Sequence, residues 1–86
     1  MKDLERILKA LANKRRLAIL KFLKRKKEAS VGSIAGEIHL SFKSTSRHLS
    51  ILASAGLVEK EQRSTQVFYR ISVLMPQPAQ FTISLF

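Results

Sequence analysis

Apolar residues recur along the first part of the chain with the spacing of helices. The first stripe follows the i, i+3, i+4, i+7 pattern of an amphipathic helix and predicts one over residues 2–12. Its members are Leu4, Ile7, Leu8 and Leu11. Asn13 then interrupts the stripe, and it suits a helix N-cap because its side-chain oxygen accepts hydrogen bonds from free backbone N–H groups. A second helix, apolar over a wider face, is therefore expected over residues 14–26.

Two serines stand where the next two helices should begin. Ser30 is expected to cap a short helix whose apolar positions end at Ile38. After a turn at His39 and Leu40, Ser41 is expected to cap a longer helix over residues 41–55. The core-facing positions of this longer helix are Thr45, Leu49 and Leu52. Gly56 follows, where a left-handed residue commonly ends a helix.

The remaining pattern changes from a helical period to alternation. Residues 57–61 and 66–71 have the alternation of two strands that form a ribbon. The polar residues 62–65 between them lack the glycine that a tight hairpin favours, so a looser loop is expected there. Residues 73–86 contain two prolines and then alternating apolar residues, which predicts an irregular or extended tail. An extra strand, a dimer contact and a floppy apolar end are the alternatives for this tail.

This order of elements predicts a mostly α-helical winged helix-turn-helix with a small β-ribbon, α-α-α-α-β-β. The expected division is a winged helix DNA-binding domain over residues 1–72 and a C-terminal tail over residues 73–86.

Composition narrows the class of partner. The chain has 86 residues, which suits one small domain, and a formal net charge of +10, which calls for a polyanionic partner. Nucleic acid and an anionic membrane both qualify on charge alone. The chain contains no cysteine, no apparent signal peptide, and no run near the ~18 apolar residues of a membrane-spanning helix. A cytoplasmic location is therefore expected.

Candidate DNA-binding residues gather on the helix over residues 41–55. Small or cationic side chains on its exposed side can donate hydrogen bonds to phosphates and base edges in the major groove. These residues are Lys43, Ser44, Ser46, Arg47 and His48. A solvated helix face is the alternative for the group, and a hydrogen bond to its own helix backbone is the alternative for Ser46. Phe42 is expected to pack against the turn, with contact to a thymine methyl as the second option.

The tip of the ribbon supplies the other candidates. Arg63 is expected to enter the minor groove, where the negative potential attracts arginine, and Ser64 lies beside it. The alternative for Arg63 is an exposed loop arginine. A metal site is not expected, because a lone histidine such as His48 without a second ligand at i+4 rarely binds a metal.

Three segments together resemble the ArsR-type (ArsR/SmtB-like) winged helix-turn-helix regulators. Residues 8–20 are similar to the entry of that family, in which an LKALADPTRLRIL pattern is typical. Residues 40–49 and 52–58 are similar to its "LS…S.HL..L..AGLV" segment, and residues 66–71 to its second wing strand. The resemblance covers about residues 4–72.

The resemblance implies a homodimeric transcriptional repressor that binds double-stranded DNA and leaves its operator when it binds an effector. Many members of the family sense metals. This chain lacks the cysteines of one common metal site, and its tail lacks the His, Asp and Glu of the other, so no metal or other cofactor is expected. The effector stays open, and so does the dimer interface, because the usual C-terminal helix is expected to be missing or replaced.

The sequence gives less support to other classes of function. Enzymatic activity is not expected, since the sequence has no nucleophile–His–acid set and no phosphate-cradling glycine loop. A winged helix that binds another protein through the apolar tail is one alternative. A basic module that binds nucleic acid or membrane without sequence preference is another, although few aromatic residues are available for stacking on bases.

Overall fold

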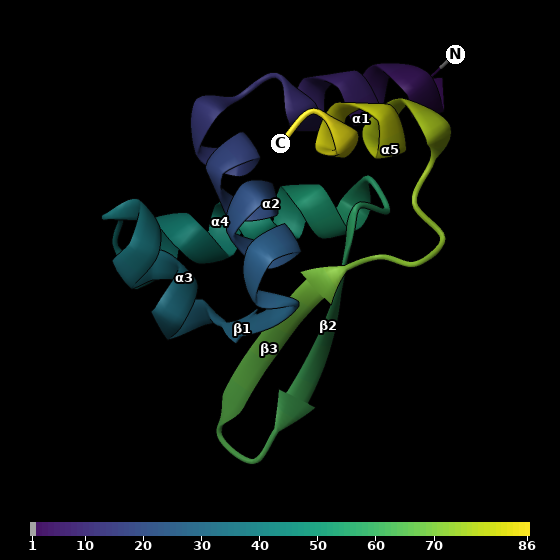
Figure 1. The fold of residues 1–86 in the computed structure, drawn as a ribbon. Coiled ribbons are helices and arrows are strands. Elements are labelled where there is room, and N and C mark those ends of the chain that lie inside the picture. The colour runs from purple at the N-terminus through teal and green to yellow at the C-terminus, as the bar shows by residue number, and fades with distance from the viewer. Residues whose placement is uncertain (1) are drawn as a thin grey trace.

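The computed structural model describes residues 2–86, and Figure 1 shows helices stacked above a projecting β-ribbon. The elements in chain order are α1 (Lys2–Leu11), α2 (Lys14–Lys26), β1 (Glu28–Ser30), α3 (Val31–Ile38), α4 (Phe42–Ser54), β2 (Val58–Arg63), β3 (Gln66–Ile71) and α5 (Gln77–Ser84). The predicted winged helix-turn-helix is confirmed, with two corrections to its β-ribbon and one to its tail.

The predicted caps set the starts of the internal helices. Asn13 Oδ1 accepts hydrogen bonds from the backbone N–H groups of Arg15 and Arg16, at 2.9 and 3.1 Å, and begins α2. Ser30 and Ser41 each accept the N–H group three residues further on, at 3.1 Å, and begin α3 and α4. These contacts pair backbone donors that would otherwise lack a partner in the first turn.

The core lies where the helices meet the base of the ribbon. Its largest fully buried apolar side chains come from α2, α3, α4 and the start of the ribbon: Ile19, Leu20, Leu23, Ile34, Leu49, Leu52 and Leu57. The apolar residues of α1 and α5 close it from the opposite side. α4 is thereby held by its apolar face, and its other face is left outside the core.

The sheet has one strand that the sequence did not predict. β1 pairs antiparallel with β3, and β3 pairs antiparallel with β2, which gives the order β1-β3-β2. The looser loop expected over residues 62–65 is also wrong. Arg63 pairs with Gln66, which leaves a two-residue turn, and Ser64 adopts the left-handed conformation with φ 57°. Serine replaces glycine there at a modest conformational cost.

The tail is a helix and not an irregular or extended segment. Pro78 lies in the first turn of α5, where a proline is tolerated because the N–H groups have no partner inside the helix. Met75, Ala79 and Ile83 are spaced four residues apart and are buried. Lys24 Nζ donates to the carbonyl of Ile83 at 3.1 Å and so ties the end of α5 to α2. The irregular or extended tail predicted for residues 73–86 is therefore wrong, and the alternative of an extra strand is wrong as well.

One buried polar atom in the core gives a test of the packing. Thr45 is fully buried, and among the described residues its Oγ1 is a buried side-chain atom without a hydrogen-bond partner. Thr45→Val is expected to raise the free energy of unfolding by about 1 kcal/mol, because the shape is kept and an unpaired polar group is removed. Thermal and urea unfolding measure the change. Thr82→Val is the matched control and should destabilise, since Thr82 Oγ1 donates to the carbonyl of Pro78 at 2.8 Å.

Candidate nucleic-acid interface

α4 separates its residues cleanly between two faces. Thr45, Leu49 and Leu52 are fully buried against the core. Lys43 and Arg47, one turn apart, are exposed on the other side. Residues 41–55 contain these two cations and no acid, so the outer face of α4 attracts an anion.

The three remaining candidates on α4 differ in exposure. Ser44 is exposed, whereas Ser46 and His48 are half-buried at the edges of the outer face. Phe42 does not pack against the turn as expected. Its side chain is 63% exposed in the first turn of α4, beside Lys43. The first turn therefore presents an aromatic ring next to a cation.

His48 makes a contact that the sequence did not predict. Its Nδ1 lies 3.2 Å from Nη1 of Arg16, which comes from α2. The same guanidinium donates through Nε to the carbonyl of Ala10 at 2.7 Å and through Nη2 to the carbonyl of Lys9 at 2.9 Å. Arg16 thus joins the last turn of α1 to α4.

The surroundings of His48 favour its neutral form. Burial is the main cause that lowers the pKa of His48 from its ordinary value, and the positive charges of Arg16, Arg15 and Arg47 lower it further. These surroundings disfavour the charged imidazolium.

The ribbon holds Arg63 in a set of ion pairs. Its guanidinium donates to both carboxylate oxygens of Glu28, at 2.7 and 2.9 Å, and to Glu61 at 3.0 Å. It also lies 4.7 Å from the centre of the Phe68 ring. The hydrogen bond from Arg63 is the main cause that lowers the pKa of both Glu28 and Glu61. In this conformation Arg63 is paired rather than free.

Charge is distributed unevenly between helices and ribbon. Three of the six acidic residues, Glu28, Glu59 and Glu61, lie in the sheet, where Arg63 and Arg70 pair with them. Much of the excess positive charge is left on the helices as a result.

The structure places the seven candidates in two groups. Five are on α4, and two, Arg63 and Ser64, are at the tip of the ribbon, which projects away from the helices (Figure 1). Arg16 is the residue that sequence reasoning missed. It looked like one of three cations after a helix cap, and its contact with a residue 32 positions away has no local signal.

Two further searches of residues 2–86 gave no candidate site. These residues contain no group of three or more His, Cys, Asp or Glu side chains placed to hold a metal ion. Within the same range, no helix has both the length and the apolar character needed to cross a membrane.

The arrangement of helices and ribbon defines a winged helix-turn-helix protein. The family model described as "Bacterial regulatory protein, arsR family" matches residues 13–60, which is more than half of the chain. The chain belongs to the ArsR family, as its sequence motifs indicated.

Named relatives agree with this assignment. The transcriptional activator HlyU of Vibrio cholerae is 42% identical over 66 residues, which are 77% of this chain and 60% of that protein. The HTH-type transcriptional regulator Rv0324 of Mycobacterium tuberculosis is 42% identical over 67 residues, which are 78% of this chain and 29% of that protein. The chain thus spans less than two thirds of the length of these curated relatives.

Solved structures show the same fold. HlyU from Vibrio cholerae superposes with a TM-score of 0.82 at 36% identity, over 98% of this chain and 87% of that chain. The DNA-binding domain of Mb0332 from Mycobacterium bovis, described as a homodimeric winged helix-turn-helix, superposes with a TM-score of 0.82 at 34% identity. That match covers 98% of this chain and 74% of the Mb0332 chain.

Proposed function

We propose that this protein is a cytoplasmic transcriptional regulator that binds double-stranded DNA as a homodimer. The observation that carries the proposal is the outer face of α4, which presents Lys43, Ser44 and Arg47 while the opposite face is locked into the core. In the proposed complex α4 enters the major groove, Lys43 and Arg47 bind phosphates or guanine edges, and the serines bind phosphates or bases. His48 and the aromatic ring of Phe42 add contacts at the edge of this face.

The ribbon would lie on the flanking minor groove in this arrangement. Ser64 at the turn is exposed and can approach the sugar–phosphate backbone. Arg63 has to exchange its carboxylate partners for DNA, so we propose that it binds after the ion pairs with Glu28 and Glu61 open.

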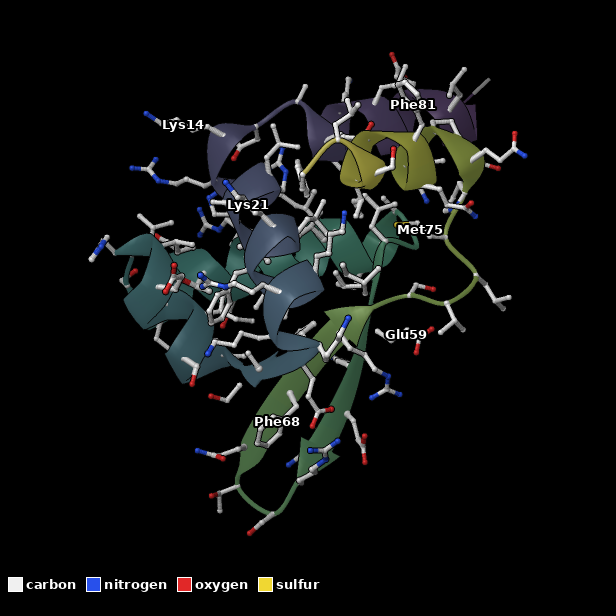
Figure 2. All side chains as sticks on the ribbon, in the orientation of Figure 1. Lys14, Lys21, Glu59, Phe68, Met75 and Phe81 are labelled. Atoms are coloured by element: carbon white, nitrogen blue, oxygen red, sulfur yellow. The ribbon has the colours of Figure 1, made fainter. Side chains whose placement is uncertain are left out.

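The proposed dimer uses the outer surfaces of α1 and α5. These helices pack side by side at the end of the molecule opposite the ribbon tip (Figure 1). They leave Leu8, Phe81 and Leu85 exposed, and Figure 2 shows Phe81 on the outer side of α5. Exposed apolar residues on two adjacent helices favour burial against a second copy. The homodimeric Mb0332 domain supports the same stoichiometry.

Fluorescence anisotropy with two duplexes tests the proposal. One duplex comes from upstream of the protein's own gene, and the other is a scrambled sequence of the same length at the same salt concentration. A clear preference for the upstream duplex is expected, with affinity that falls steeply as salt rises because bound counterions are released. Equal binding to both would reduce the function to nonspecific nucleic-acid binding. Binding to neither would favour the protein-interaction alternative.

The direction of regulation needs its own measurement. The family resemblance implies a repressor, whereas the relative HlyU is named as a transcriptional activator. We propose repression through occupation of the operator. A promoter–reporter fusion with and without this gene tests it, and repression predicts higher expression in the absence of the gene.

A further inference from the structure

The contact between Arg16 and His48 determines which nitrogen of the imidazole carries the proton. A guanidinium has N–H donors and no acceptor, so the 3.2 Å contact requires Nδ1 of His48 to be the acceptor. A neutral imidazole with an unprotonated Nδ1 carries its hydrogen on Nε2. Arg16 therefore selects one of the two neutral tautomers of His48.

Arg16 is well placed to impose this choice because its position is fixed by the backbone. Two of its nitrogens donate to the carbonyls of Lys9 and Ala10, at 2.9 and 2.7 Å. The third faces His48. Protonation of Nδ1 would remove this acceptor and add a positive charge near those of Arg15, Arg16 and Arg47.

The other nitrogen of the ring is available to a ligand. Nε2 of His48 has no hydrogen-bond partner among the described residues, and it is not among their buried unpaired atoms, so it contacts solvent. His48 lies one turn after Ser44 and directly after Arg47, at the edge of the outer face of α4. A donor such as Nε2–H at this position could bind a hydrogen-bond acceptor on DNA.

We propose that Arg16 is a positioning residue of the DNA interface, which holds His48 as a neutral Nε2–H donor so that His48 binds an acceptor atom of DNA. The acceptor is a phosphate oxygen or an acceptor on a base edge in the major groove, such as N7 or O6 of guanine. A base edge that presents a donor, such as N4 of cytosine, is disfavoured at this position. The DNA part of this inference rests on the proposed function, and the tautomer part does not.

NMR of imidazole ¹⁵N nuclei tests the tautomer without DNA. His48 in the wild-type protein at neutral pH is expected to show a protonated Nε2 and an unprotonated Nδ1. His39 is exposed, its imidazole makes no hydrogen bond to the described residues, and it serves as the reference in the same spectrum. Arg16→Met removes every donor and should return His48 to a mixture of tautomers. A proton on Nδ1 of the wild type, or an unchanged tautomer in a folded Arg16→Met, would overturn the role of Arg16.

Two substitutions of His48 test the donor itself, and they keep the test usable if Arg16→Met does not fold. In His48→Gln the side-chain amide reaches the place of Nε2, whereas in His48→Asn it reaches only the place of Nδ1. His48→Asn is expected to bind DNA about tenfold more weakly, which is the contribution of one hydrogen bond to a charged or strong acceptor, and His48→Gln should retain most of the affinity. Equal affinity of wild type and both variants would overturn the contact.

The two duplexes distinguish the source of the acceptor. Equal losses on the upstream and the scrambled duplex would assign a phosphate, and a loss on the upstream duplex alone would assign a base. A double variant, Arg16→Met with His48→Asn, is expected to bind no more weakly than His48→Asn alone, because both act through one contact. Additive losses would contradict the positioning role. A wild type that binds neither duplex refutes the proposed function and leaves the tautomer result standing.

Discussion

Phe81→Glu is expected to convert the protein into a monomer and to lower its affinity for a two-fold operator by about a hundredfold or more. Phe81 is 67% exposed on the outer side of α5, and a carboxylate there would have to be buried without a partner when two copies meet. A dimer binds two half-sites together, and the loss of this linkage typically weakens binding by roughly 10²–10⁴-fold. Sedimentation equilibrium measures the mass, and anisotropy measures the operator affinity.

Leu74→Glu is the matched control for this experiment. It makes the same kind of change, from apolar to acidic, at an 87% exposed residue on the loop before α5. It should remain a dimer and lose only the small part of the affinity that one added negative charge costs. Since Phe81 is exposed, its replacement should leave the thermal unfolding of the protomer nearly unchanged. A dimeric Phe81→Glu would place the dimer interface elsewhere on the surface.

The parts of the fold that the sequence predicted correctly depend on short-range chemistry. Asn13, Ser30 and Ser41 each bind N–H groups within three residues, so their role is visible in a few letters of sequence. The spacing of Thr45, Leu49 and Leu52 on α4 identifies a buried face in the same way. On α1 the predicted stripe is only half buried, because Leu4 and Leu8 are exposed.

The errors arose where distant residues decide the structure. β1 has three residues, too few for an alternation to stand out, and it exists because β3 lies beside it. In the tail, Phe81, Ile83 and Leu85 alternate as in a strand, but Ile83 and Ala79 pack inward four residues apart against the other helices. The sequence of the tail is compatible with a strand and with a helix, and burial against the rest of the chain favours the helix.

In the candidate site, too, the sequence predicted the features that nearby residues determine and missed those that distant residues determine. The sequence identified the outer face of α4, because its residues follow from the helical period. It missed the constraint on two of the candidates, since His48 and Arg63 are held by partners 32 and 35 positions away. Whether the seven candidates contact DNA stays a prediction, and one substitution on α4 tests it most directly.

Arg47→Ala is expected to weaken binding to the upstream duplex by about 1–3 kcal/mol, which is roughly 5- to 150-fold. Arg47 is exposed at the middle of the outer face, and no salt bridge within residues 2–86 occupies it. Its loss therefore removes a DNA contact without breaking an ion pair. Anisotropy over a series of salt concentrations measures the affinity, and the slope against log salt should fall by about 1 if Arg47 neutralises a phosphate.

Lys21→Ala is the matched control, because it removes one exposed cation from α2. Lys21 comes five residues after Arg16, so it faces away from the side of α2 that reaches α4. The variant should bind both duplexes nearly as tightly as the wild type does.

Arg47→Lys separates the two roles proposed for Arg47, which are contact with a phosphate and contact with a guanine edge. Retained affinity would assign a phosphate, whereas a loss confined to the upstream duplex would assign two hydrogen bonds to guanine, which lysine cannot reproduce with the same geometry. If Arg47→Ala and Lys21→Ala lost equal affinity on both duplexes, α4 would contribute only to the overall field, and its insertion into the major groove would be refuted.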